Sequence, residues 1–403
     1  MAGRHMREPG GPPPGRTSVR DTVSRSFSWV PRHIGPIGID FGARVVRMLQ
    51  LARHKGQLTM TCYAQREIPE GVTDAADRRQ LQMQAVQDML KTERFSGRNT
   101  ATALSWDDLN IRNVRIPTMP EGEIATAIRF EAGDRFGMDA TQAEMRFLVA
   151  GDVRQGTDIR QEVIVLAAGR KAIDAHVQRL TQVGLHPVAI DAQPCALFRC
   201  FERFLRRDED SNQVNAFVDI GYTGTRVIMS RGAELTFIKS IPIGGRRFDE
   251  LVSEGMELST TEAAQLRIRL HRYHVAMLTG QEMRIGPDEA VGEGMRRAIL
   301  DAQRPALEQL SKEIALCIRY CSVTFRGPRS DSVTVLGGEA CNAELLQLLS
   351  DQVHVPFRVG KPMRNITLES AYGSADRRTG QPEWATVLGL ALKPTIENAA
   401  VAS

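Results

Sequence analysis

Two segments of the chain place an aspartate and a glycine directly after a short apolar run. Asp40 and Gly42 follow residues 37–39, and Asp219 and Gly221 follow residues 216–218. A carboxylate at a strand tip, beside backbone N–H groups that can approach an anion, is the geometry of a phosphate cradle. One such tripeptide is weak evidence, because Asp and Gly are common in ordinary turns. Two in matched contexts predict facing loops that hold the phosphates of a nucleotide.

A third apolar run ends in Gly337, Gly338 and Glu339. This turn could contact the base or sugar of the same nucleotide. The alternative is a duplicated hairpin that binds no ligand. Other phosphate, nucleophile and metal motifs are absent from the sequence: it has no Gly-x-x-x-x-Gly-Lys-Ser/Thr, no Gly-x-Gly-x-x-Gly after a strand and no Gly-x-Ser-x-Gly. His271 and His274 lack a third ligand in a zinc-like frame, and the six cysteines form no Cys-x-x-Cys pair.

The elements that must position these loops follow the same layout twice. Each Asp-x-Gly is followed by a strand, a turn containing glycine, another strand and the dipeptide Ile-Pro. The predicted strands are residues 45–51 and 58–68 in the first copy, and 226–230 and 235–241 in the second. This repetition predicts an α/β protein with a duplicated domain.

Apolar periodicity and capping signals complete the outline. The predicted helices are residues 74–94, 121–136, 171–183, 194–206, 247–256, 261–269, 305–323, 343–353 and 384–392. Further strands are predicted at 100–104, 111–116, 144–150, 162–168, 186–190 and 332–336. Residues 275–300 are predicted as loop and helix, and residues 360–383 as loop.

These elements divide into six regions. The predicted regions are a disordered Arg/Pro/Gly-rich tail at 1–33, a first core subdomain at 34–104 plus 184–212, an inserted subdomain at 105–183, a second core subdomain at 213–243 plus 330–394, a helical subdomain of the second lobe at 244–329, and a tail at 395–403.

Composition narrows the functional classes. Apolar content of 42% and charged content of 25% are typical of a globular protein. The formal net charge is +4, and residues 1–33 account for all of it, so the remainder has no nucleic-acid footprint. No apolar run is long enough to span a membrane, and residues near the start lack a signal-peptide core. Val19, Val23, Phe27 and Val30 share one helical face, for which a solvated tether is favoured over a membrane-surface helix.

With these motifs in place, the chain resembles the PilM family of type IV pilus assembly proteins, within the actin-like ATPase superfamily. The resemblance runs from residue 37 to residue 392. Its segments are the two phosphate motifs (37–47 and 218–226), the connecting helix (190–201), the adenosine motif (335–340) and the closing helix (385–392). Residues 128–132, 241–245 and 258–263 resemble stretches more specific to PilM.

The resemblance implies a duplicated actin-like (ribonuclease H-like) fold with two lobes and a small α/β subdomain inserted in the first lobe. It implies ATP bound between the lobes, with Mg²⁺ held through water by Asp40 and Asp219. The nucleotide-binding residues expected from it are Asp40, Gly42, Arg44, Asp219, Gly221, Thr223, Thr225, Arg267, Gly337, Gly338 and Glu339. Asp191 and Gln193 are the candidates for positioning an attacking water.

The first loop departs from the family pattern. Ala43, Arg44 and Val45 replace a Ser/Thr-rich run, which removes hydroxyl hydrogen bonds to phosphate worth roughly 1.5–3 kcal/mol each. Arg44 could offset this loss by pairing with a phosphate, or it could point to solvent. The resemblance therefore implies a scaffold with a nucleotide site that is a slow ATPase or an inactive one.

The family also implies a partner, the cytoplasmic N-terminal peptide of a PilN-like inner-membrane protein. An extended peptide could bind beside the inserted subdomain or add to a strand edge there. The apolar candidates for this groove are Ile111, Val114, Ile116, Ile128 and Phe147, with core packing as the alternative for each. The expected location is cytoplasmic and peripheral at the inner membrane, with a homo-oligomeric ring possible and no nucleic acid bound.

Three alternatives remain open at this stage. A degenerate adaptor would bind no nucleotide. A small-molecule kinase or phosphatase of the superfamily would need a substrate pocket and a catalytic carboxylate, for which the chain has no motif. An FtsA-like membrane-tethered filament protein would need a basic amphipathic helix, which residues 395–403 do not offer.

Overall fold

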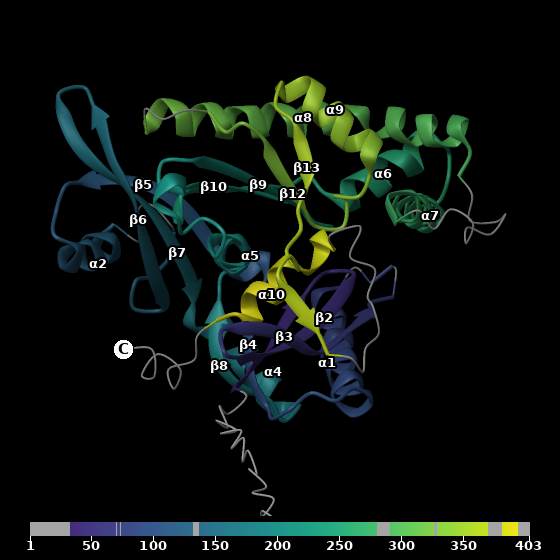
Figure 1. The fold of residues 1–403 in the computed structure, drawn as a ribbon, viewed down its shortest axis with the longest axis horizontal. Helices are drawn as coiled ribbons and strands as arrows, with labels where there is room; N and C mark the ends of the chain where they lie inside the picture. Colours follow the sequence, from purple (N-terminus) through teal and green to yellow (C-terminus); the bar gives the residue numbers. More distant parts are fainter. Residues whose placement is uncertain are drawn as a thin grey trace, which may run out of the picture. The chain divides into compact units, whose positions relative to one another are not determined.

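The computed structural model describes residues 33–69, 71–72, 74–131, 137–279, 291–325, 329–369 and 381–393. The predicted helical face at Val19, Val23, Phe27 and Val30 lies outside these residues, as does the tail at 395–403. In the described part of the chain, no helix combines the length and apolar character needed to cross a membrane. The described elements form three sheets with helices packed on them (Figure 1).

The first lobe is built on a six-stranded sheet in the order β14-β3-β2-β1-β4-β8. Its strands are β1 (His33–Phe41), β2 (Val45–His54), β3 (Gln57–Glu67), β4 (Asn99–Ala103), β8 (His186–Asp191) and β14 (Ile366–Leu368). The first three strands are antiparallel, while β4 and β8 continue the sheet in parallel from β1. Strands β1 and β2 are buried on both faces, and Ile37, Ile39 and Met48 pack together in one core cluster.

The second lobe is built on a five-stranded sheet in the order β11-β10-β9-β12-β13. Its strands are β9 (Val214–Ile220), β10 (Thr225–Arg231), β11 (Glu234–Ile241), β12 (Val333–Leu336) and β13 (Phe357–Val359). Three antiparallel strands again lead into two parallel ones. The order and directions repeat those of β3-β2-β1-β4-β8, which confirms the predicted duplication.

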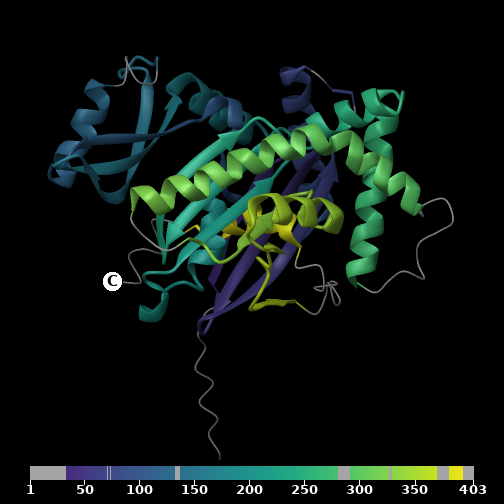
Figure 2. The same ribbon diagram turned by 90° about the horizontal axis from the view of Figure 1, so that it is seen from above.

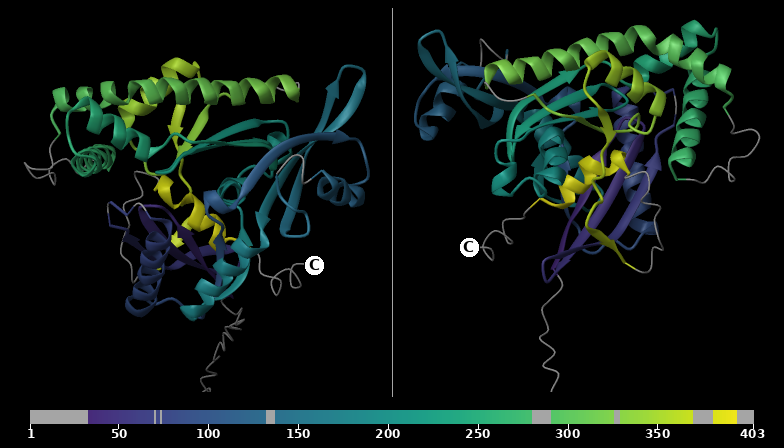
Figure 3. Two further views of the ribbon diagram at one scale, coloured as in Figure 1. Left: turned by 180° about the vertical axis from the view of Figure 1, so that it is seen from behind. Right: turned by 45° about the horizontal axis from the view of Figure 1, so that its top comes forward.

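Four helices belong to the first sheet and the space beside it: α1 (Ala75–Thr92), α4 (Arg170–Gln182), α5 (Gln193–Glu202) and α10 (Ala385–Ala391). Helix α1 begins where predicted, with the Asp74 carboxylate accepting from two backbone N–H groups. Helix α10 packs on α5 and β1 although it comes from the end of the chain (Figure 3). A Cβ at Gly389 would lie 1.6 Å from the Ala196 carbonyl oxygen, so only glycine permits this approach.

The second sheet carries α6 (Gly245–Gly255), α7 (Thr260–Thr279), α8 (Glu293–Thr324) and α9 (Ala343–Val353). The capping box at Ser259 and Glu262 is confirmed, since each side chain bonds the backbone N–H of the other. Helix α8 is longer than predicted, 32 residues with Pro305 inside it, and contacts β10 and β11 (Figure 2). The prediction of residues 275–300 as loop and helix is right in part, and residues 280–290 lie outside the described chain.

The inserted subdomain has a three-stranded antiparallel sheet in the order β5-β7-β6. Its elements are β5 (Asn110–Pro117), α2 (Glu121–Phe130), β6 (Ala143–Gln155) and β7 (Asp158–Gly169), with the short turn η1 (Trp106–Asp108) before them. The predicted strands at 144–150 and 162–168 are the parts of a longer hairpin that lie away from its turn. Of the predicted helix at 121–136, α2 ends at Phe130 with Glu131 as its C-cap, and residues 132–136 lie outside the described chain.

The prediction of residues 360–383 as loop was wrong for β14. This three-residue strand pairs in parallel with β3. It is too short for periodicity to indicate, and it exists because a distant strand supplies its hydrogen bonds.

Candidate functional site

A cavity of about 460 Å³ lies where the first and second lobes meet. Both Asp-x-Gly loops and the Gly-Gly turn contribute to its wall. The predicted site residues that line it are Asp40, Gly42, Arg44, Gln193, Asp219, Gly221, Thr223, Arg267, Gly337, Gly338 and Glu339. Two predicted residues do not line it, Thr225 and Asp191. The structure therefore brings together side chains that are up to about 300 positions apart in the sequence.

The topology explains why the loops meet. The first loop joins β1 to β2 and the second joins β9 to β10, at equivalent corners of the two sheets. Strand β12 runs parallel to β9, so its end brings Gly337 beside the second loop. Gly337 has a φ of +87°, and a Cβ there would lie 2.4 Å from the Ile220 carbonyl oxygen. Glycine is therefore required at this turn.

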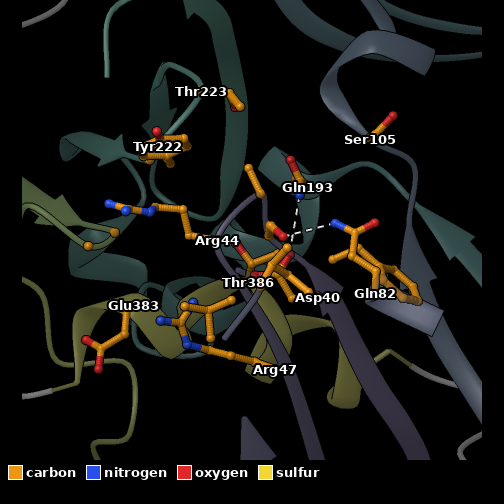
Figure 4. Close-up of a pocket in the computed structure, with 18 of the residues that line it drawn as sticks. Asp40, Arg44, Arg47, Gln82, Ser105, Gln193, Tyr222, Thr223, Glu383 and Thr386 are labelled. Atoms are coloured by element: carbon orange, nitrogen blue, oxygen red, sulfur yellow. Dashed lines mark hydrogen bonds between the residues drawn. The ribbon is translucent and has the colours of Figure 1, made fainter. Parts of the chain in front are cut away.

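The two loop aspartates are each 8% exposed and are connected by two polar side chains. Arg226 donates from Nη1 to Asp219 Oδ2 at 3.1 Å, and from Nη2 to Gln193 Oε1. Gln193 in turn donates from Nε2 to Asp40 Oδ1 at 3.3 Å (Figure 4). Burial raises the pKa of Asp40 above its ordinary value, against the opposing effect of the Arg47 charge. The hydrogen bond between Gln193 and Arg226 joins the two lobes.

An arginine stands opposite each aspartate in its hairpin. The register pairs Asp40 with Arg47 and Asp219 with Arg226, seven residues apart in both copies. Our sequence analysis did not single out either arginine, although the equal spacing across a tight hairpin was a usable signal. The Arg47 guanidinium lies 5.8 Å from the Trp384 ring centroid, and its buried Nε atom has no hydrogen-bond partner.

Arg44 lines the cavity and is also directed to the second lobe. It extends from the first loop to the second lobe, where Nη1 lies 3.6 Å from Asp249 Oδ2. Its guanidinium also lies 4.7 Å from the centroid of the Tyr222 ring (Figure 4). Cation–π contacts of this kind contribute about 0.5–1 kcal/mol at partly exposed sites. Arg44 is therefore a second contact between the lobes beside the cavity.

Arg267 and Glu339, both expected to bind the nucleotide, contact each other directly. Arg267 is 8% exposed and donates to Glu339, to Asp249 and to the Gly245 carbonyl oxygen. Burial raises the pKa of Asp249, and the Arg267 charge opposes that effect. This cluster joins α6, α7 and the Gly-Gly turn into one wall of the cavity.

Asp191 and Thr225 are held in other contacts. The Asp191 carboxylate lies 2.7 Å from Arg199 and 3.0 Å from Lys393. The Thr225 hydroxyl donates to the Ile243 carbonyl oxygen at 2.7 Å, and this residue is fully buried. Of the two residues predicted to position a water, only Gln193 reaches the cavity, and its amide already bonds Asp40 and Arg226.

A Mg²⁺ ion held by both aspartates does not fit this arrangement. Such an ion needs its water shell and uncompensated negative charge on both carboxylates. Arg226 already supplies positive charge to Asp219, and Gln193 connects that guanidinium to Asp40. Among the residues that the structure describes, no group of three or more His, Cys, Asp or Glu side chains is arranged to hold a metal ion.

A second cavity, of about 450 Å³, lies beside the inserted subdomain. Its lining residues are Asp107, Asp108, Leu109, Asn110, Ile111, Met138, Ala167, Gly169, Ala172 and Ser240. Of the five residues predicted for a partner groove, Ile111 lines this cavity. Val114, Ile116 and Ile128 are buried in the subdomain core, and Phe147 packs against that core.

Comparison with known proteins places the chain in a family. The family model described as type IV pilus assembly protein PilM matches residues 38–273, more than half of the chain. A solved structure described as the PilM-PilN type IV pilus biogenesis complex is 23% identical, with a TM-score of 0.70 over 89% of this chain and 99% of that chain.

Two further solved structures have lower sequence identities and lower TM-scores. The ethanolamine utilization protein EutJ from Carboxydothermus hydrogenoformans is 14% identical, with a TM-score of 0.49 over 90% of each chain. The cytoplasmic domain of EpsL, an inner-membrane component of the type II secretion system of Vibrio cholerae, is 11% identical, with a TM-score of 0.32 over 55% of this chain and 75% of that chain. Because the family model matches more than half of the chain, the chain belongs to the PilM family of type IV pilus assembly proteins.

Proposed function

We propose that this protein is a scaffold of a type IV pilus machine or a related secretion or competence machine. In this proposal it binds a nucleotide of the ATP class between its lobes, and beside its inserted subdomain it binds the N-terminal peptide of a PilN-like inner-membrane protein. Partner binding would hold it at the cytoplasmic face of the inner membrane. A ring of several copies is compatible with this role.

One observation carries the nucleotide part of the proposal. Both Asp-x-Gly loops and the Gly337-Gly338 turn open onto the same cavity, as a ligand with phosphates at one end and a base at the other requires. A cavity of about 460 Å³ is within the usual range for small-ligand sites. Turnover is expected to be slow or absent, because Asp191 is held outside the cavity and the Gln193 amide is already bonded.

The peptide part of the proposal is supported by the second cavity and by the similarity to a PilM-PilN complex. Leu109, Ile111 of β5 and Ala167 of β7 line this cavity beside the acidic end of η1, with Ile111 and Leu109 available to an apolar side chain of the peptide. A backbone entering there could also bond the strand ends.

Calorimetric titration tests both parts. ATP should bind the purified protein saturably, and Gly337→Ala should abolish binding because its Cβ would displace the second loop. Gly122→Ala is the matched control, since a Cβ at Gly122 meets no atom within 4 Å. A wild-type protein that binds no ATP would favour the alternative, an adaptor without nucleotide.

The second titration uses a synthetic peptide with the sequence of the cytoplasmic N-terminus of a PilN-like inner-membrane protein. Ile111→Glu should weaken its binding at least tenfold, because the substitution puts a charge into the second cavity. Ile159→Glu alters an exposed residue of the same subdomain and should leave binding unchanged. Equal binding by both variants would contradict the assignment of this cavity.

A further inference from the structure

We propose that the cavity between the lobes binds the polyphosphate of its ligand without a divalent metal. Arg226 takes the place of the cation, and Arg47 receives the phosphate. This inference rests on the proposed nucleotide function and specifies how that site works. It predicts that nucleotide affinity is the same in the presence and absence of Mg²⁺.

Side chains already supply positive charge between the two aspartates. A metal in this position would neutralise both carboxylates and attract the phosphates. Arg226 performs the first task for Asp219 through a 3.1 Å hydrogen bond, and its second amino group reaches the Gln193 amide that bonds Asp40. The Arg226 side chain is 11% exposed. If it moved away to admit a metal, the buried Asp219 carboxylate would lose its ion-pair partner.

Arg47 is the counterpart of Arg226 in the first hairpin. The same register places it opposite Asp40. Its guanidinium lies over Trp384, and the buried Nε atom has no hydrogen-bond partner. Arg47 lines the cavity and pairs with no carboxylate of the described residues, and a phosphate oxygen is an acceptor for the amino groups of a guanidinium. Arg47 is thus a donor in the cavity wall that lacks an acceptor.

The rest of the cavity wall is also rich in arginine. Arginine is the commonest residue type lining the cavity, and α1 and α4 contribute Arg78, Arg79 and Arg179 to it. Planar guanidinium groups bind phosphate oxygens in pairs and remain charged at all physiological pH values. Eight arginines and seven carboxylates line the cavity, so side chains already neutralise the carboxylates and leave a small excess of positive charge for a polyphosphate. Metal-free ATP or a related polyphosphate is the ligand that this wall fits.

The experiment is calorimetric titration of the full chain with ATP, first in excess MgCl₂ and then in EDTA. The proposal expects dissociation constants that agree within about twofold. Binding at least tenfold tighter with MgCl₂ would overturn the inference and leave the proposed nucleotide function standing. Binding in neither buffer would overturn both. Sodium tripolyphosphate in EDTA should displace ATP, and failure to displace it would contradict the role assigned to the arginines.

Two variants test the individual side chains. Arg47→Gln should weaken ATP binding in EDTA at least tenfold, whereas Arg66→Gln, on the same sheet but outside the cavity, should not change it. Equal binding by these two variants would overturn the role of Arg47. Arg226→Gln should weaken binding in EDTA and make it depend on MgCl₂. If Arg226→Gln fails to fold, Arg226→Lys, which keeps the charge, should bind ATP equally with and without metal.

Discussion

The two hairpins that border the cavity have the same strand arrangement, but the arginine at the equivalent position has different partners in each. In the second hairpin, Arg226 pairs with the aspartate opposite it and with Gln193. In the first hairpin, Arg47 lies opposite Asp40 but is directed to Trp384, and its Nε atom stays without an acceptor. Duplication repeated the positions of the charges. Their roles were set by neighbours that come from other parts of the chain.

The difference between the loops has the same origin. The first loop carries Arg44, which contacts Tyr222 and Asp249 of the second lobe. The second loop carries Tyr222, Thr223 and Gly224, and its Gly221 N–H closes the turn on the Gly224 carbonyl oxygen at 3.0 Å. One loop therefore reaches across the cavity and the other folds on itself. Nucleotide entry would have to accommodate Arg44 but not a comparable side chain of the second loop.

The largest difference between the two hairpins is expected in the unfolding free energy that is lost when the charge of each arginine is removed. Arg226→Met leaves Asp219 buried without its ion pair, and such a loss costs about 3–5 kcal/mol of unfolding free energy. Arg47→Met removes a cation that holds no carboxylate within ion-pair distance among the described residues, and it should cost less than about 1 kcal/mol. Urea denaturation measures both values. Equal losses would show that the hairpins use their arginines alike.

Acid should act on the first hairpin through His176, whose ring packs edge-on against Phe41 at 5.7 Å. Burial lowers the pKa of His176 to about 4, and the Arg179 charge adds to this effect. The unfolded chain binds this proton near pH 6.5, so the stabilisation is complete above that pH and is lost as the pH falls toward 4. The expected loss is about 2–3 kcal/mol.

His176→Gln is the comparison for this prediction. Its unfolding free energy, measured by urea denaturation from pH 7 to pH 4, should fall less steeply than that of the wild type over this interval. Parallel curves for the two proteins would rule out a contribution from His176.

The smallest contrast concerns the glycine of each Asp-x-Gly. A Cβ at Gly42 would lie 2.5 Å from the Val45 carbonyl oxygen, which is fixed in the hairpin. A Cβ at Gly221 would lie 3.2 Å from the Gly224 carbonyl oxygen. Gly42→Ala should therefore destabilise the protein by about 2 kcal/mol and Gly221→Ala by about 1 kcal/mol or less. Thermal unfolding followed by circular dichroism compares them, and a reversed order would show that the second loop is the less tolerant one.

Local signals in the sequence were sufficient for most of the fold. Strand alternation and glycine turns predicted both hairpins, and the Ser259–Glu262 capping box predicted the start of α7. Eleven of the thirteen residues predicted for the nucleotide or for catalysis line one cavity, the exceptions being Thr225 and Asp191. The hairpins and the capping box could be predicted because each depends on residues within one turn, one strand or one repeated motif. Nucleotide binding by the residues that line the cavity stays a prediction.

The remaining features depend on contacts between distant segments. Strand β14 exists because β3 pairs with it. Arg44 lies over Tyr222 rather than in solvent because the second lobe lies within reach, and Ile116 and Ile128 are core residues because β7 covers them. The sequence by itself determined two Asp-x-Gly loops with an arginine seven residues after each aspartate. Only the tertiary structure decided which arginine is paired. Gln193, which bonds Arg226, and Trp384, which lies beside Arg47, both come from segments distant in the sequence.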